Sequence, residues 1–282
     1  MVKMTLFKAY NDAKKKLKAA GIEAYGFEAR EIMRHLTGYT NAQIINKYDE
    51  QLTPYLQTIY NSIMEKRLNH YPLQYILGCW SFYGYEFLVG EGVLIPRADT
   101  ETLVDVALDY LKDKEEAKVL DLCSGTGCIA VTIEKNSNAT VTAVEKFDTP
   151  FQYLERNIAH NKSNVTAVKD DVFSFSTDER YDLIVSNPPY ISAEEMEIID
   201  TETSFEPDTA LYGGEDGLLF YRLITSRYRR FLKDGGMLAL EVGFTQAEAV
   251  KTLMSDAGYT EIGVKEDING IQRVVFGTVK KV

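Results

Sequence analysis

The chain has 282 residues, a formal net charge of −11, and 45% hydrophobic and 26% charged residues. This length can form one large domain and one small domain, and the composition is that of an ordinary globular protein. No apolar run approaches the ~20 residues that span a bilayer, and the N-terminus lacks a secretory signal pattern, so we expect no membrane association and a cytoplasmic location. Three cysteines without a CxxC pair indicate reduced thiols, and three scattered histidines predict no metal site.

The charge is unevenly distributed along the chain. Residues 1–80 contain 11 Lys+Arg against 7 Asp+Glu, whereas residues 81–282 contain 20 against 35. The acidic balance of the larger part argues against binding to nucleic-acid phosphates, so we expect no nucleic-acid partner. The basic surface of the smaller part could face an acidic partner or could simply be solvated.

The N-terminal part, residues 1–78, is predicted to be a small helical bundle without a catalytic motif. Apolar residues recur there at helical spacing over 5–20, 27–37, 41–47 and 53–68. Two apolar segments around Gly90-Glu91-Gly92 then predict a β-hairpin, and we assign residues 79–97 to a hairpin linker.

From residue 98 onward, helical and strand patterns alternate. Such alternation predicts an α/β fold, a Rossmann-like, doubly wound and mostly parallel sheet. Asn269-Gly270 between the last two strands predicts a closing hairpin, which adds an antiparallel edge and brings the sheet to seven strands. Residues 191–216 are polar and acidic and are predicted to form a long loop.

The most informative stretch is an apolar run, Leu183–Val185, which is soon followed by Asn187-Pro188-Pro189-Tyr190. The run predicts a fully buried strand of a parallel sheet. Proline has no N–H and a fixed φ, so the two prolines end the strand and stiffen its exit. Asn187 and the Pro188 carbonyl are therefore held at the carboxyl end of a strand, where open α/β sheets bind ligands. Taken alone, the motif could also be a rigid turn.

A second signal, Asp121-Leu122-Cys123-Ser124-Gly125-Thr126-Gly127, joins a predicted strand to a helix. Its glycines allow a ligand to approach the backbone, so we expect a side chain at Gly127 to abolish ligand binding while leaving the fold intact. Glu145, at the end of the next strand, suits ribose hydroxyls. The pattern fits a nicotinamide dinucleotide or another adenosine-containing cofactor. Asp121 favours the second, because a carboxylate suits an amino group better than a pyrophosphate.

Together the two motifs resemble those of class I S-adenosylmethionine-dependent methyltransferases that act on amide or exocyclic amino nitrogens. Flanking segments narrow the resemblance to the peptide chain release factor glutamine methyltransferases, from about residue 65 to the C-terminus. These segments are Pro72–Gly78, Phe82–Gly84, Val93–Arg97, Glu206-Pro207, Ala210-Leu211 and Gly213–Leu218. The chain departs from the family at Ala98-Asp99, where the family has Pro-Glu, and at Val172, where some members place an aromatic residue beside the adenine.

The resemblance implies a class I methyltransferase domain over residues 98–282 that uses S-adenosylmethionine. The implied substrate is the glutamine of the Gly-Gly-Gln motif in bacterial-type class I release factors, and residues 1–78 would help a monomeric enzyme to hold that partner. The resemblance implies that the cofactor is bound by Asp121, Cys123, Ser124, Gly125, Thr126, Gly127, Glu145, Asp171, Val172 and Asn187.

The expected catalytic and substrate-binding residues are Asn187, Pro188, Pro189, Tyr190 and Arg97. The Asn187 side-chain oxygen and the Pro188 carbonyl can accept both N–H groups of a glutamine amide. Tyr190 can pack on the planar amide, whereas Arg97 either contacts the substrate or forms a salt bridge. Glu206 and Asp216 are expected to be solvated and to take no part in catalysis.

Three other functions fit part of this pattern. A DNA adenine N6-methyltransferase also uses Asn-Pro-Pro-Tyr, but the acidic catalytic part and the lack of a basic recognition domain argue against it. A nicotinamide dehydrogenase would bind NAD at the glycine-rich turn. Calorimetry that compares binding of NAD and of S-adenosylmethionine would distinguish this function from that of a methyltransferase. The intact Asn187–Tyr190 motif argues against a non-catalytic translation-factor binding protein.

Overall fold

The computed structural model describes residues 4–280, which divide into two compact units. The first comprises residues 4–78 together with Thr201–Phe205. The second comprises residues 79–200 together with residues 206–280. None of the helices within residues 4–280 is long and apolar enough to cross a bilayer.

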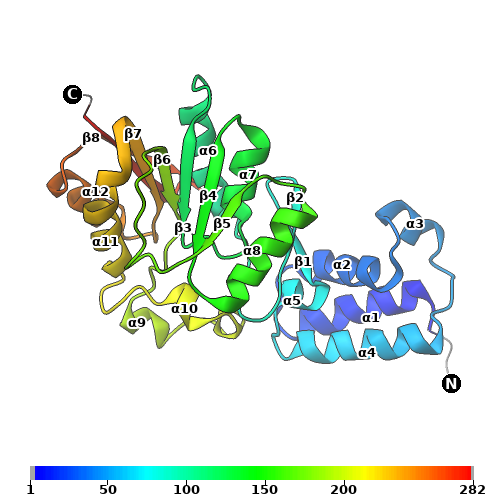
Figure 1. The fold of residues 1–282 in the computed structure, drawn as a ribbon. Helices are drawn as coiled ribbons and strands as arrows, with labels where there is room; N and C mark the ends of the chain where they lie inside the picture. Colours follow the sequence, from blue (N-terminus) through cyan, green and yellow to red (C-terminus); the bar gives the residue numbers. More distant parts are fainter. Residues whose placement is uncertain (1–3, 281–282) are drawn as a thin grey trace. The chain divides into compact units, whose positions relative to one another are not determined.

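The first unit is a bundle of helices (Figure 1). Its helices are α1 (Leu6–Ala19), α2 (Tyr25–Thr37), α3 (Asn41–Asn46), α4 (Pro54–Leu68) and α5 (Leu73–Leu77). Thr5, Thr40 and Thr53 cap α1, α3 and α4, each through a side-chain oxygen that accepts a backbone N–H of the first turn. The short helix α5 was not predicted from the sequence, because five residues are too few to show a helical period.

A buried ion pair lies in the core of this bundle. The Arg67 guanidinium donates to both carboxylate oxygens of Glu28, at 2.6 Å from Nε and 2.9 Å from Nη2. Arg67 is 2% exposed and Glu28 is 8% exposed. Two charges removed from water in this way depend on each other, because loss of one leaves the other unpaired and desolvated.

The second unit begins with a β-hairpin of β1 (Cys79–Phe82) and β2 (Tyr85–Leu88). The predicted turn at Gly90-Glu91-Gly92 is wrong, since the strands turn at Tyr83-Gly84, both with positive φ. Such a two-residue turn matches the strand twist. Gly90 has a different role, because a Cβ there would lie 2.2 Å from the Tyr153 hydroxyl oxygen.

The rest of this unit is a doubly wound, mostly parallel sheet, which confirms the predicted fold class (Figure 1). The strand order is β5-β4-β3-β6-β7-β9-β8, and β9 runs antiparallel to both of its neighbours, β7 and β8, whereas the other neighbouring pairs are parallel. The strands are β3 (Lys118–Leu122), β4 (Thr140–Glu145), β5 (Thr166–Lys169), β6 (Tyr181–Ser186), β7 (Leu232–Glu241), β8 (Tyr259–Glu266) and β9 (Gln272–Val279).

Helices cover both faces of the sheet. Helices α6 (Glu101–Leu111), α7 (Cys128–Asn136) and α8 (Asp148–His160) pack on the face that includes Val119 and Val185. Helices α11 (Leu219–Arg227) and α12 (Ala247–Asp256), with the 3₁₀ turn η3 (Tyr228–Phe231), pack on the face that includes Leu120 and Ile184. The central strands are therefore buried on both sides, which explains their continuous apolar sequences.

The segment 191–216, predicted as a plain loop, contains short helical turns instead. These are α9 (Ala193–Met196), η2 (Thr203–Phe205) and α10 (Asp208–Leu211). Ser192 caps α9 through a capping box with Glu195. Elements of three or four residues have no hydrophobic period, so composition alone could not indicate them.

We expect Glu28→Ala to lower the free energy of unfolding of the full chain by about 3–5 kcal/mol, because it leaves the buried Arg67 guanidinium without its main partner. Urea unfolding followed by circular dichroism would measure this loss. Glu31→Ala is the matched control in the same helix, because its partner Arg34 has a side chain that is 48% exposed. The control should cost no more than ~1 kcal/mol, and equal losses for both variants would contradict the assigned role of the buried pair.

Candidate active site

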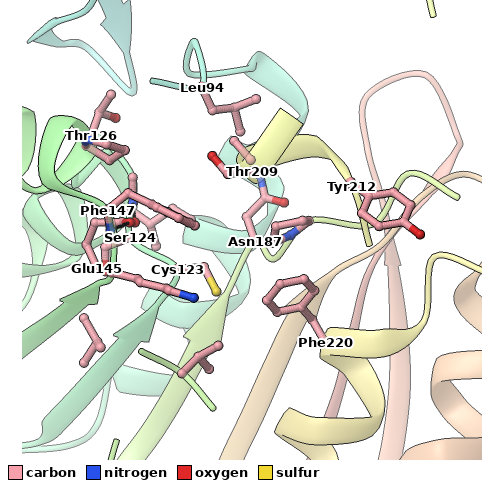
Figure 2. Close-up of a pocket in the computed structure, with 18 of the residues that line it drawn as sticks. Leu94, Cys123, Ser124, Thr126, Glu145, Phe147, Asn187, Thr209, Tyr212 and Phe220 are labelled. Atoms are coloured by element: carbon pink, nitrogen blue, oxygen red, sulfur yellow. Dashed lines mark hydrogen bonds between the residues drawn. The ribbon is translucent and has the colours of Figure 1, made fainter. Parts of the chain in front are cut away.

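The site lies where the strand order reverses. Strands β4 and β5 follow β3 on one side and β6 and β7 lie on the other, so the carboxyl ends of β3 and β6 meet at a topological switch point. A pocket of ≈ 620 Å³ opens there (Figure 2). This is the volume and the position typical of small-molecule sites in α/β proteins.

Ten of the residues singled out from the sequence line this pocket: Arg97, Cys123, Ser124, Gly125, Thr126, Glu145, Asp171, Val172, Asn187 and Pro189. They come from segments far apart in the chain, and the parallel register brings these segments to one edge of the sheet. Four predicted residues do not line it: Asp121, Gly127, Pro188 and Tyr190.

The glycine-rich turn is closed by hydrogen bonds of its own. The Gly127 N–H donates to the Ser124 carbonyl oxygen at 2.7 Å, and Cys123 and Gly125 adopt positive φ values of 57° and 53°. A Cβ on Gly125 would meet nothing within 4 Å, so its backbone is open to a ligand.

Gly127 has a different reason to be glycine. Its φ is +80°, and a Cβ there would lie 2.4 Å from Cδ1 of Leu154 in α8. A side chain at Gly127 would therefore disturb the packing of α7 against α8. The expectation that such a variant keeps its fold while losing the ligand does not agree with this geometry.

Two acidic side chains lie at the carboxyl ends of the neighbouring strands β4 and β5: Glu145 is the last residue of β4, and Asp171 follows β5. Glu145 is buried and accepts the Gly125 N–H at 2.9 Å and the Phe147 N–H at 2.8 Å. Burial raises the pKa of Glu145. Burial also opposes ionisation of Asp171, but the Phe173 N–H and the Lys146 ammonium outweigh it and lower the pKa of Asp171. The pocket therefore presents hydrogen-bond acceptors at adjacent strand ends, the pattern expected for a polyhydroxylated ligand.

Asp121 lies inside the end of β3 and is fully buried. Neither of its carboxyl oxygens has a hydrogen-bond partner among the described residues. Burial, with a smaller contribution from the charge of Glu145, raises the pKa of Asp121 to about 8. A buried and unpaired carboxyl group next to a ligand pocket fits a ligand that carries positive charge.

Aromatic walls complete the pocket, and the sequence reasoning missed them. Phe147, Phe173 and Phe220 line it, and the rings of Phe173 and Phe220 meet edge to face with centroids 5.5 Å apart. Figure 2 shows Phe147 and Phe220 among the pocket side chains. These rings give the pocket aromatic surface, whereas Val172, at the position where some members of the resembling family have an aromatic residue, gives none. Phe147, two residues after Glu145, could have been found from its position, whereas Phe220 belongs to a distant helix.

Asn187 is positioned directly after β6. Its side-chain Nδ2 donates to the Thr100 hydroxyl oxygen at 3.3 Å. Gly213 packs against the motif so closely that a Cβ would lie 2.7 Å from the Pro189 carbonyl oxygen. Gln246 of the segment before α12 donates from Nε2 to the Tyr190 carbonyl oxygen at 2.8 Å. The motif is thus held at both ends, and two of the residues that hold it, Thr100 and Gln246, were not identified from the sequence.

Tyr190 lines a second and smaller cavity of ≈ 200 Å³, together with Ile191, Glu195, Ile199 and residues 243–246. Burial raises the pKa of its hydroxyl group well above the usual range. Its ring is packed against the buried cluster on the α11–α12 face of the sheet. Tyr190 therefore packs against the core beside this second cavity, and its stacking on a substrate amide stays a prediction.

Arg97 forms a salt bridge with Glu206 and also lines the pocket. The expectation that Glu206 is solvated is wrong, because Glu206 is 3% exposed and also accepts the Ile95 N–H at 2.9 Å. Burial raises the pKa of Glu206, while Arg97 opposes that effect. Asp216, in contrast, is exposed and pairs with Arg222, as expected for a solvated residue.

We expect Asp121→Asn to stabilise the ligand-free protein more at pH 8 than at pH 5. Burial raises the pKa of Asp121 from its usual 3.8 to about 8, so between these values the folded protein holds a proton that the unfolded chain has released. Stability contributed by this group therefore falls as pH rises, and the variant lacks that fall. Urea unfolding at both pH values would measure the difference. The exposed Asp178→Asn serves as control, and an equal pH response of the two variants would contradict the prediction.

Comparisons with known proteins agree with this geometry. A family model described as the PrmC N-terminal domain matches residues 8–78, and one described as the methyltransferase small domain matches residues 98–206. The fold is similar to a crystal structure of a methyltransferase from Pyrococcus furiosus, with a TM-score of 0.54, 22% identity, and coverage of 72% of this chain and 92% of that chain.

Two curated relatives extend over almost the whole chain. The release factor glutamine methyltransferase of Geobacter sulfurreducens is 38% identical over 261 residues, which are 92% of this chain and 91% of the relative. That of Thermodesulfovibrio yellowstonii is 38% identical over 254 residues, 88% of this chain and 91% of the relative. With the N-terminal domain, the methyltransferase domain and the overall length all matched, the chain belongs to the release factor glutamine methyltransferase family.

Proposed function

We propose that this enzyme transfers a methyl group from S-adenosylmethionine to the side-chain amide nitrogen, N5, of the glutamine in the Gly-Gly-Gln motif of class I peptide chain release factors, and so modulates translation termination. Membership of the family supports this reaction. The observation that carries it is the position of Asn187, whose side-chain amide lies at the pocket, at the carboxyl end of β6.

The pocket fits S-adenosylmethionine, which supplies a methyl group on a positively charged sulfur. The open backbone at Gly125 allows close approach, and Glu145 can accept hydrogen bonds from ribose hydroxyls. The aromatic walls suit a flat base. The unpaired carboxyl group of Asp121 suits an amino group close by, because the attraction between the two charges would offset the desolvation of the carboxylate.

The residues of the motif suit an amide nucleophile. An amide nitrogen is a poor nucleophile because its lone pair is delocalised, but it carries two N–H donors. The side-chain oxygen of Asn187 and the carbonyl of Pro188 can accept both, which orients the nitrogen and favours its pyramidal form in the transition state. No strong base is required, because the methylated nitrogen loses its proton readily.

We further propose that the protein acts in the cytoplasm as a monomer and does not bind nucleic acid. Its partner class acts in translation, and all three cysteines are free thiols, as expected in a reducing compartment. The excess of acidic residues in the catalytic part opposes phosphate binding, which also disfavours DNA adenine N6-methylation.

Residues 1–78 are proposed to recognise the release factor, with residues 79–97 as a linker and 98–282 as the catalytic domain. Exposed lysines such as Lys8 and Lys15 lie seven residues apart on α1 and give this domain a basic surface. A complementary acidic surface on the partner would speed association.

We expect the double variant Lys8→Glu/Lys15→Glu to raise KM for an intact release factor about tenfold, since rim charges act mainly on association. Methylation of a short peptide that contains Gly-Gly-Gln should not change, because the peptide lacks the rest of the partner surface. Equal KM values for the variant and the wild type with the intact factor would argue against recruitment through this surface.

For the chemistry, we expect Asn187→Ala to lower the rate of glutamine methylation by about 10²-fold or more, the range for loss of one transition-state hydrogen bond. Mass spectrometry of the release factor would follow the added methyl group, and calorimetry would show a much smaller change in cofactor affinity. Asn187→Asp keeps an acceptor oxygen and should retain more activity than Asn187→Ala. Wild-type rates in both variants would reduce Asn187 to a turn residue.

A further inference from the structure

The proposed reaction places a strict demand on Asn187. Its side-chain amide has an acceptor end, Oδ1, and a donor end, Nδ2, of nearly the same shape. The acceptor end must face the N–H of the substrate, because two donors that face each other repel. The backbone of the motif does not decide between the two orientations, since rotation of the amide by 180° exchanges them.

Thr100 contacts the donor end. Its hydroxyl oxygen accepts from Asn187 Nδ2 at 3.3 Å, and Thr100 is only 3% exposed. It ends the 3₁₀ turn η1 (Ala98–Thr100), and the following residue is anchored because Glu101 Oε1 accepts the Tyr83 N–H at 2.7 Å. A threonine hydroxyl can donate or accept, and in the structure it accepts, so it holds the donor end of the Asn187 amide.

We propose that Thr100 is a positioning residue that orients the Asn187 amide, with Nδ2 held by the hydroxyl group and Oδ1 left to accept the N–H of the substrate amide. Among the described residues, the hydrogen bond to Thr100 is the only one that the Asn187 side chain makes. This inference rests on the proposed function, because it names a residue that prepares the same reaction.

The test compares Thr100→Val with Thr100→Ser in the full-length enzyme, with an intact release factor and S-adenosylmethionine, and with mass spectrometry as the readout. Valine keeps the shape without the hydroxyl group, so kcat should fall by about tenfold or more while cofactor affinity by calorimetry stays within ~3-fold. Serine keeps the hydroxyl group and should restore most of kcat. Thr102→Val, a buried threonine of α6 outside the pocket, is the matched control for the loss of a hydroxyl group.

Equal kcat for Thr100→Val and Thr100→Ser would overturn the inference while wild-type methylation still supported the proposed function. A wild-type enzyme that adds no methyl group to the release factor would overturn both.

Discussion

The site depends on the parallel pairing of β3 with β6. Leu122 and Ser186 are register partners, and the Ser186 hydroxyl group donates to the Leu122 carbonyl oxygen at 2.7 Å. This buried bond ties together the two strand ends from which the glycine-rich turn and the Asn-Pro-Pro-Tyr motif depart. Because the strands run in the same direction, both segments leave the sheet at one edge, and a cofactor and an amide can meet between them.

Buried carboxyl groups give this edge its chemical character. Asp121, Glu145 and Glu241 end or nearly end β3, β4 and β7, and burial raises the pKa of each. Carboxyl groups in such positions weaken the fold at neutral pH unless a ligand or a hydrogen bond compensates them. Their placement suits the binding of a cationic cofactor and an oriented amide, and it lowers the stability of the ligand-free fold.

Local patterns could not reveal the residues that support the motif. Thr100 and Gln246 contact it through hydrogen bonds, yet each is separated from Asn187 by tens of residues. The prediction for Glu206 was wrong in another way. Its position in an acidic loop indicated a solvent-exposed side chain, but the structure buries it beside Arg97. Burial of a polar residue is decided by its partners, and those partners are brought together only by the fold.

The sequence by itself determined the alternation of helices and strands and the mostly parallel sheet, because periodicity, glycine turns and prolines act over a few neighbouring residues. Its local motifs, together with the family resemblance that they carry, also indicated ten of the residues that line the pocket. Only the tertiary structure decided that the first hairpin turns at Tyr83-Gly84, that Tyr190 faces a second cavity, and that Gly127 accommodates Leu154. These outcomes depend on contacts between elements distant in the chain, where the close packing of side chains fixes which surfaces remain open.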